Sequence, residues 1–506
     1  MATPGRLPPD PLGMTNRHTM KTRTLPAALA ATAVLLAGCA AGGHLEPDAR
    51  AIRAGQLGLV AGAASSRDEF PRSDWWTQFD DPELNRLIRQ ALADNPTLQE
   101  AQARMRQAQA AAGAAHADLE PRLGAAVNST RQRFSENDIY PPPLGGGIYS
   151  ENQALLQAGY EFDFFGRQRA ALEAAVGQAR AAQAQAQAAR VLLAANVAAS
   201  YIDLARLVAQ RAVLARSLKQ RQDIVRLVND RVGAGLESTI SLRQAEVGIP
   251  LVRLRAEQNA QALAEARHAL AALLGQGPQA TEHLAPSLGA LPLPAQPQRL
   301  PAELLGRRAD VVAARWQAQA ALAGVRAARA SFYPNISLTA FAGYTALGFS
   351  QFLSAGSHAY GIGPALTLPI FEGGKLRANL RGQTAAADAA IARYNATLVN
   401  AVREVADALS DRRSLEQQIG EQQQALRLAR QAHGLVQSRY GAGLGNYLDV
   451  LTSDDAVLQQ ELAGAGLKAQ ALIDDVALIR ALGGGYAAGP LPALPASASN
   501  AVAARP

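Results

Sequence analysis

The chain has 506 residues, enough for roughly two or three ordinary domains, but its composition does not suit a single thick globular core. Aromatic residues make up only 5%, while Ala, Gln and Arg dominate long tracts, a bias typical of extended helices. The net charge is +7 and falls to about +4 without the basic N-terminus, too little to indicate a nucleic-acid partner.

The N-terminus carries an export signal. Lys21 and Arg23 precede an apolar run over residues 25–37 that is too short to span a membrane. The run ends in Leu-Ala-Gly-Cys, which resembles a bacterial lipobox in which Cys39 becomes the lipidated first residue of the mature chain. We predict that Met20 is the true start, so residues 1–19 are a misannotated extension and residues 20–38 are the signal peptide.

Cys39 is the only cysteine, so no disulfide can form within the chain. Ala40 follows it, whereas an Asp at that position would resemble an inner-membrane retention signal. We therefore predict that the chain is anchored in the outer membrane. Residues 39–82 are then expected to form a loose tether below the lipid.

A helix is predicted over residues 83–118, with Asp81 as its cap, Pro82 at its first position and Pro121 as its stop. A matching segment at 302–331 is stopped by Pro334, which indicates an internal duplication.

Beyond each of these stops the apolar period changes from helical to two. In one such segment Leu156, Ala158 and Tyr160 alternate with Gln157 and Glu161. An apolar face opposite a polar one, at this length, is typical of tilted transmembrane strands. A soluble antiparallel sheet with one buried face would show the same period. The strands are expected at about 121–134, 150–164, 333–345 and 358–371.

Long proline-free tracts follow the second and fourth strands and predict very long helices, one of them from Gly166 to about Asn229, or ~95 Å. They lead to two Gly-x-Gly tips: Arg231–Leu236 returns as Arg439–Leu444, 208 positions later. Glycine is favourable where a helix ends with positive φ, so each tip predicts a helical hairpin.

The duplication divides the chain into two repeats, 83–275 and 302–483. Between them, residues 276–301 contain six prolines and are expected to form a linker without secondary structure. Residues 484–506 are expected to be a disordered tail.

A four-stranded sheet facing lipid would leave unpaired amides at its edges, so several chains must close one barrel. A small barrel needs about eight strands, which a dimer supplies with a plugged interior, whereas a trimer supplies about twelve and leaves a lumen. The helical hairpins would continue the wall into the periplasm.

Short motifs spread over residues 75–483 carry a family resemblance. The motifs are Trp76–Leu87, Asn95-Pro96, Tyr160–Gly166, Arg307–Val311, Phe332–Leu338, Pro369–Gly374 and Ala481–Gly485. With the lipobox, they resemble the outer membrane factor family, the TolC-type efflux channels, in the lipoprotein branch (NodT-type) that serves resistance-nodulation-division pumps.

The resemblance implies a mostly α-helical fold with a membrane β-barrel part. A homotrimer would form a 12-stranded barrel, a periplasmic α-barrel built from duplicated helical hairpins, and an equatorial belt. The implied function is the passive exit duct of a tripartite efflux pump for drugs or other small toxic compounds. The implied partners are a periplasmic adaptor protein, an inner-membrane pump of the resistance-nodulation-division type and outer-membrane lipid. Ala309 and Arg315 stand where the family usually has Pro and Glu, so contacts near them are expected to differ.

In similar channels the stretch after the second tip lines the periplasmic mouth. Three copies of Asp449 around one axis would form a ring that attracts cations. Leu448 and Leu451 are candidates for an apolar constriction, and Tyr440 and Arg439 for latch groups between protomers. Asp449 could equally be a carboxylate favoured by the helix dipole.

The glycine tips are the candidate contacts for the adaptor, although glycines there shape the turn in either case. Only the second tip is followed by Asp449, so we assign the gate to the second hairpin and a structural role to the first. The contact candidates are Gly233, Gly235, Gly441, Gly443 and Arg231.

The sequence does not predict an enzyme. The seven histidines show no metal-ligand spacing, and Glu372–Lys375 lacks the outer residues of a phosphate-binding loop. We expect no catalytic residue, metal or cofactor. Two alternatives to the efflux duct stay open: an outer-membrane channel for type I protein secretion, and a periplasmic coiled-coil structural or adaptor lipoprotein. The last predicts no membrane strands.

Overall fold

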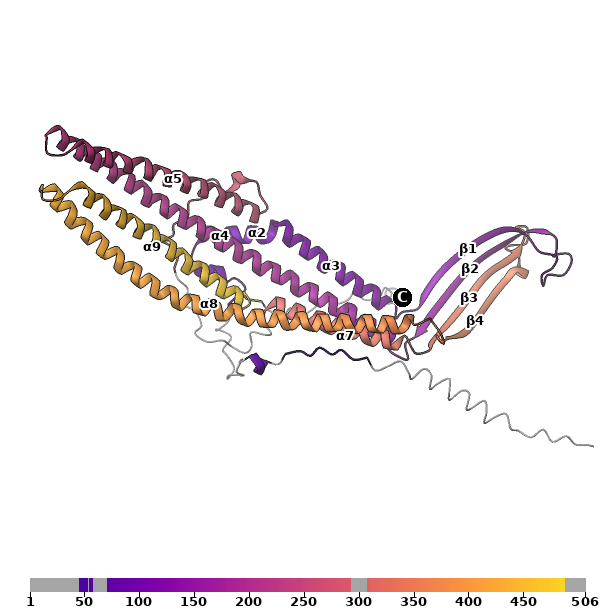
Figure 1. Cartoon of the computed structure of the whole chain (residues 1–506). Helices are drawn as coiled ribbons and strands as arrows, with labels where there is room; N and C mark the ends of the chain where they lie inside the picture. The colour runs from indigo at the N-terminus through magenta and orange to yellow at the C-terminus, as the bar shows by residue number, and fades with distance from the viewer. Residues whose placement is uncertain (1–44, 53, 58–70, 293–306, 487–506) are drawn as a thin grey trace, which may run out of the picture.

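The computed structural model describes residues 45–52, 54–57, 71–292 and 307–486, and it shows an elongated molecule with helices at one end and a sheet at the other (Figure 1). The predicted export signal and Cys39 lie outside the described residues, as does most of the predicted tail.

Four long helices form the end away from the sheet. Helices α4 (Arg167–Gly233) and α8 (Lys375–Gly441) have 67 residues each. Helices α5 (Thr239–Leu273) and α9 (Tyr447–Ala481) have 35 each. This equality of length is the structural form of the duplication. The helices lie side by side in the order α5, α4, α9, α8, so they make one curved wall with α5 and α8 at its edges (Figure 1).

Shorter helices complete the wall towards the sheet. Helices α3 (Pro96–Ala117) and α7 (Ala309–Ala330) have 22 residues each, and the order there is α3, α4, α7, α8. Helix α2 (Pro82–Asp94) precedes α3 and begins as predicted. The Asp81 carboxylate accepts hydrogen bonds from the backbone of Glu83 and Leu84, and Pro82 occupies the first helical position.

A hydrophobic core at the middle of the molecule joins these helices. It gathers side chains from the short 3-10 helix η3 (Trp75–Phe79), from α2, from the middle of α4 and from the C-terminal parts of α5 and α9. Its aromatic members are Trp75, Trp76, Phe79 and Tyr201. Fully buried members include Phe79, Leu84, Ile88, Ile202, Leu204 and Leu270.

Two predicted connecting segments contribute to this core. Residues 71–79 were assigned to a loose tether, but both tryptophans of η3 are buried. In the predicted linker, the 3-10 helix η4 (Pro278–Thr281) is followed by a chain that packs on α5. The prolines prevent long elements there, yet the apolar side chains between them are still driven out of water. Leu284, Leu288 and Leu291 are buried.

The sheet contains four antiparallel strands in sequence order. They are β1 (Arg122–Arg133), β2 (Ile148–Phe162), β3 (Asn335–Leu347) and β4 (His358–Thr367). The short 3-10 helix η5 (Ala355–Ser357) lies in the loop before β4. The predicted fold class, mostly helical with four strands and duplicated hairpins, is confirmed.

The register of the sheet collects the apolar positions on one face. Leu156 pairs with Ala125 on one side and Ala342 on the other, and Ala342 pairs with Tyr360. The opposite face contains mainly polar or small residues, as in the pairing of Gln157 with Gly124, with Leu155 and Phe341 among its apolar exceptions. One face of the sheet is therefore suited to lipid and the other to water.

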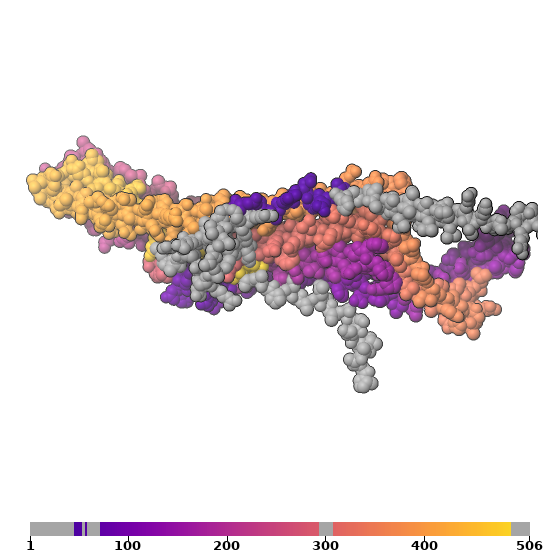
Figure 2. Space-filling model, turned by 90° about the horizontal axis from the view of Figure 1, so that it is seen from below, coloured from indigo at the N-terminus to yellow at the C-terminus, as the bar shows by residue number. Residues whose placement is uncertain are grey.

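The N-terminal segment is held against the outside of the wall. The Ala49 amide donates a 2.8 Å hydrogen bond to Asp388 of α8, and the Ile52 amide donates a 2.9 Å bond to Asn395. Figure 2 shows this segment (indigo) as a strip along α8 (orange). The prediction of a loose tether is therefore wrong for residues 45–52, because the side chains of α8 satisfy its backbone amides.

Candidate gate at the helical tips

The two hairpins end in turns of the same geometry. The Leu236 amide donates a 2.8 Å bond to the Arg231 carbonyl, and the Leu444 amide donates a 2.9 Å bond to the Arg439 carbonyl. Gly235 and Gly443 have φ of +70° and +76°, which L side chains rarely adopt. The second glycine of each tip is therefore required by the turn itself.

The first glycine of each tip has a different environment. Gly233 and Gly441 are the last residues of α4 and α8, and neither has positive φ. A Cβ added at either one would meet no atom of the described chain within 4 Å. The turn does not require these two glycines, and they leave a surface without side chains at the tips.

Tyr440 joins the two tips. The residue is only 2% exposed, and its hydroxyl donates a 3.3 Å hydrogen bond to Glu237 of the first hairpin. Arg231 of the first hairpin donates a 2.9 Å bond to the Tyr440 carbonyl. Burial and the Glu237 charge raise the pKa of Tyr440, so its hydroxyl stays protonated as a donor.

These contacts change two assignments. Tyr440 was expected to act between protomers, but it is buried inside one chain and a neighbouring copy cannot reach it. Arg231 was expected to contact an adaptor, but it is partly buried against Tyr440. Arg439 donates to Leu444 within its own tip, and in the described part of the chain no hydrogen bond or ion pair joins it to the first hairpin.

The remaining gate candidates lie on the first turns of α9. The Asn446 side chain caps the helix by accepting a 2.9 Å bond from the Asp449 amide. Asp449 and Leu448 are exposed, Leu451 is half-buried, and Tyr447 and Val450 of the same turns are buried. Burial raises the pKa of Tyr447 to about 12. The buried side of α9 therefore anchors it to the wall while Leu448 and Asp449 stay free.

Sequence reasoning missed Glu237 and Tyr447. Glu237 directly follows the first tip, and the second repeat has Gly445 at the matching position, so comparison of the repeats does not indicate a role for Glu237. The available sequence signal is the presence of a carboxylate beside one tip and a tyrosine in the other.

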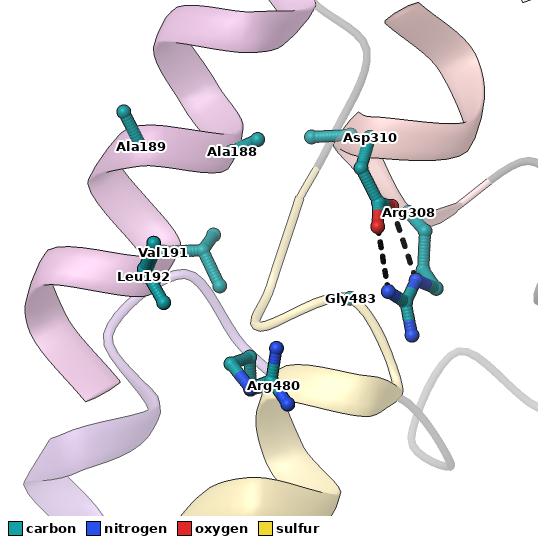
Figure 3. Close-up of a pocket in the computed structure, with 9 residues that line it drawn as sticks. Ala188, Ala189, Val191, Leu192, Arg308, Asp310, Arg480 and Gly483 are labelled. Carbon is teal, nitrogen blue, oxygen red and sulfur yellow. Dashed lines mark hydrogen bonds and ion pairs between the residues drawn. The ribbon is translucent and has the colours of Figure 1, made fainter. Parts of the chain in front are cut away.

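The middle of the molecule contains a second notable feature, a cavity of about 220 Å³ between α4, α7 and the end of α9 (Figure 3). Arg308 on its wall is buried, with ion pairs to Asp310 at 2.6 Å and Glu404 at 2.9 Å. Gly483 has φ of +101°, and a Cβ there would lie 2.1 Å from the Arg307 carbonyl oxygen. These contacts fix the end of α9 to the start of α7, so the region is a structural junction.

The architecture defines the class of protein: one subunit of an outer-membrane channel, with an amphipathic sheet for the membrane and a helical wall extending from it. The sequence model of the family described as "Outer membrane efflux protein" matches residues 87–276 and 300–484. The chain belongs to this outer membrane efflux protein family. Family members are outer-membrane proteins with a long periplasmic helical part, and this chain is an outer-membrane protein.

Individual relatives have similar length and fold. The chain is 31% identical to the multidrug resistance outer membrane protein MdtP of Escherichia coli, over 93% of this chain and 98% of that protein. It is 36% identical to the fusaric acid resistance protein FusA of Burkholderia cepacia, over 71% and 68%. The crystal structure of VceC from Vibrio cholerae is similar with a TM-score of 0.79 and 37% identity, over 83% of this chain and all of that one.

Proposed function

We propose that three copies of the chain form the exit duct of a tripartite efflux pump, through which small toxic compounds pass from the periplasm to the exterior. The observation that carries the proposal is that the sheet and the helical wall both end in open edges on the same two sides. In the described sheet, β1 and β4 each pair on one side only.

The strand edges require partners in a membrane. Unpaired backbone groups in hydrocarbon cost several kcal/mol each, so the sheet is stable there only when other strands close it into a barrel. Three copies supply twelve strands in all. That number leaves room for a lumen lined by the polar face of the sheet.

The helical edges support the same assembly. The exposed apolar residues of α5 lie at positions 240, 247, 251 and 254, a spacing typical of a helix that packs along a neighbour. On the opposite edge of the wall, α8 exposes Leu428 and Leu435, also one heptad apart. Packing α5 of one copy against α8 of the next would cover both stripes and close the wall into a tube.

The tips support the expected adaptor contact. The side-chain-free surface at Gly233 and Gly441 permits close approach of another protein's backbone, and the turn does not explain these glycines. We propose that this surface receives the periplasmic adaptor, and that an inner-membrane pump of the resistance-nodulation-division type supplies the energy. Cys39 is the proposed lipid anchor, and among the described residues Ala49 and Ile52 bind α8.

The first turns of α9 form the proposed periplasmic gate. In the trimer, exposed Asp449 and Leu448 would face the axis as an acidic and an apolar ring, with Leu451 one turn on. Tyr447 anchors α9 and Tyr440 anchors the second tip, so these two residues hold the proposed gate against the wall.

A susceptibility panel on a deletion strain tests the function. Deletion is expected to increase sensitivity to at least one group of toxic compounds, and the wild-type gene to restore tolerance. A variant with Ala340→Arg, which places a charge on the lipid face of β3, is the matched loss-of-barrel control and should not restore tolerance. If deletion changes tolerance to no compound, the efflux assignment fails.

A further inference from the structure

Arg221 lies buried in the helical wall, on the side of the tips that faces the sheet. It belongs to α4, about 14 residues before the first turn, and its side chain is 5% exposed. The guanidinium is 3.1 Å from the Asp454 carboxylate and also forms an ion pair with Asp455, both on α9. The side chain of Asp454 is also 5% exposed. A buried charge therefore connects the first hairpin to the second.

Further side chains extend this contact to α8. Gln220 of α4 donates a 2.8 Å hydrogen bond to Asp454 and lies 3.0 Å from His433 Nε2 of α8. His433 Nδ1 is in turn 3.0 Å from the Ser453 hydroxyl of α9. We call these side chains together with Arg221 the Arg221 cluster.

Helix α5 makes room for the cluster. A Cβ added at Gly248 would lie 2.8 Å from Arg221 Nη1, so a glycine allows the guanidinium to pass between α4 and α5. All four helices of the wall therefore meet at one level. Pro250 lies two residues beyond, where it removes a backbone donor from α5.

The cluster is close to the gate along α9. Asp454 follows Asp449 by five residues, or about 7.5 Å of helix rise. Tyr447 and Val450 on the buried side of the same turns pack with residues of both tips. The position of the first turns of α9 is thus fixed at two levels, by Tyr440 and Tyr447 at the tip and by Arg221 further along the helix.

Such a cluster contributes mainly by fixing the relative position of the helices that it joins. A buried ion pair adds little net stability over apolar packing, but its charges tolerate few alternative arrangements, since an unpaired buried charge is costly. Burial raises the pKa of Asp454, and the Arg221 charge opposes that shift. Moving α9 away from α4 would leave both charges in a poor environment.

We propose that Arg221 is the positioning residue of the gate: through Asp454 and Asp455 it holds the first turns of α9, and with them Asp449, in the closed arrangement. This inference rests on the proposed function. It also revises the assignment of a purely structural role to the first hairpin, because that hairpin supplies the residue that positions the gate.

Conductance of the purified full-length channel in planar lipid bilayers tests the proposal. Arg221→Leu is expected to raise the resting conductance several-fold, and Arg221→Lys to restore part of the closure. The matched control is Arg216→Leu. Arg216 also joins α4 to α9, through Glu461 at 3.3 Å, but its side chain is 65% exposed. Surface pairs of this kind contribute little, so the control should conduct like the wild type.

A second variant covers the case in which Arg221→Leu does not assemble. Gly248→Ala keeps every charge and displaces only the flexible end of Arg221, so trimers should form and show a smaller increase in resting conductance. Wild-type conductance in the assembled trimers of every variant that displaces or removes Arg221 would overturn the inference. If the wild-type chain forms no channel, the proposed function fails and this inference fails with it.

Discussion

The Arg231 guanidinium lies 4.6 Å from the centre of the Tyr440 ring, and the two residues come from opposite tips of the same chain. A cation over an aromatic face is attracted by the ring quadrupole, and the hydrogen bond to the Tyr440 carbonyl fixes its orientation. Arg439 occupies the corresponding place in the second repeat but bonds within its own tip. The duplication therefore produced two similar turns, and the arginine of the first turn binds the tyrosine of the second.

This asymmetry predicts different effects for the two arginines. Arg231→Ala removes a cation–π contact and a hydrogen bond, together worth about 1–3 kcal/mol, so the second tip should loosen. Single-channel recordings should show a higher resting conductance for Arg231→Ala and a wild-type value for Arg439→Ala. Equal effects of the two substitutions would contradict the conclusion that Arg231 alone of the two arginines holds the second tip in place.

The acidic ring predicts an effect on ion selectivity. Asp449→Asn removes three negative charges from the mouth of the trimer while keeping size and the cap from Asn446. The reversal potential measured in a salt gradient should shift towards zero, because the channel loses part of its preference for cations. Asp230→Asn, an exposed carboxylate at the first tip, is the control. A shift of equal size in the control would show that the second hairpin has no special place in the gate.

The register of the sheet predicts opposite outcomes at two adjacent residues of β3. Ala340 lies on the apolar face and Thr339 on the polar face. Ala340→Arg near the middle of the strand should cost about 2–4 kcal/mol in the membrane, while Thr339→Arg should be tolerated in the lumen. The yield of folded trimer in outer-membrane fractions separates the two. Loss of trimer with Thr339→Arg alone would reverse the assignment of faces.

A buried carboxylate of α9 predicts a dependence of stability on pH. Burial raises the pKa of Asp475 to about 6, although Arg412 opposes the shift at 2.5 Å. Because the folded state binds this proton more tightly than the unfolded state, the contribution is complete below pH 3.8 and is lost as pH rises through about 6. Between these limits it amounts to about 3 kcal/mol.

Thermal unfolding followed by circular dichroism at several pH values measures this contribution. In the wild type, protonation of Asp475 should increase the stability of the folded state as the pH falls from 7 towards 5. Asp475→Asn should reduce that increase. Asp407→Asn is the control, since Asp407 pairs with Arg403 at the surface. An unchanged pH profile in Asp475→Asn would exclude the proposed linkage.

The membrane part of the fold was predictable because its pattern is local. Alternation of Leu156 with Gln157 already assigns each side chain to a face, and pairing with the next strand preserves that assignment. The first strand gave a weaker signal because the alternation of Leu123, Ala125 and Val127 with Gly124, Ala126 and Asn128 is short and is followed by polar residues. Its observed register nevertheless places Leu123 and Val127 on the same apolar face.

The contacts that position the gate could not be predicted in the same way. The glycine tips indicate a turn because the turn is formed by consecutive residues. The pairing of Arg231 with Tyr440, or of Arg221 with Asp454, depends on how two hairpins more than 200 residues apart pack together. The buried leucines after η4 were missed for a related reason, since prolines dominate the local pattern while burial depends on distant helices.

The open edges of β1 and β4 have a genetic consequence. In the proposed trimer each chain pairs with the sheets of two others, so one chain with a defective edge strand prevents closure of the barrel in every trimer that contains it. When half of the chains carry such a defect, only about one trimer in eight is free of it under random assembly. Edge variants should therefore be dominant over the wild-type gene, whereas variants at the tips, which leave the edges intact, should assemble freely with it.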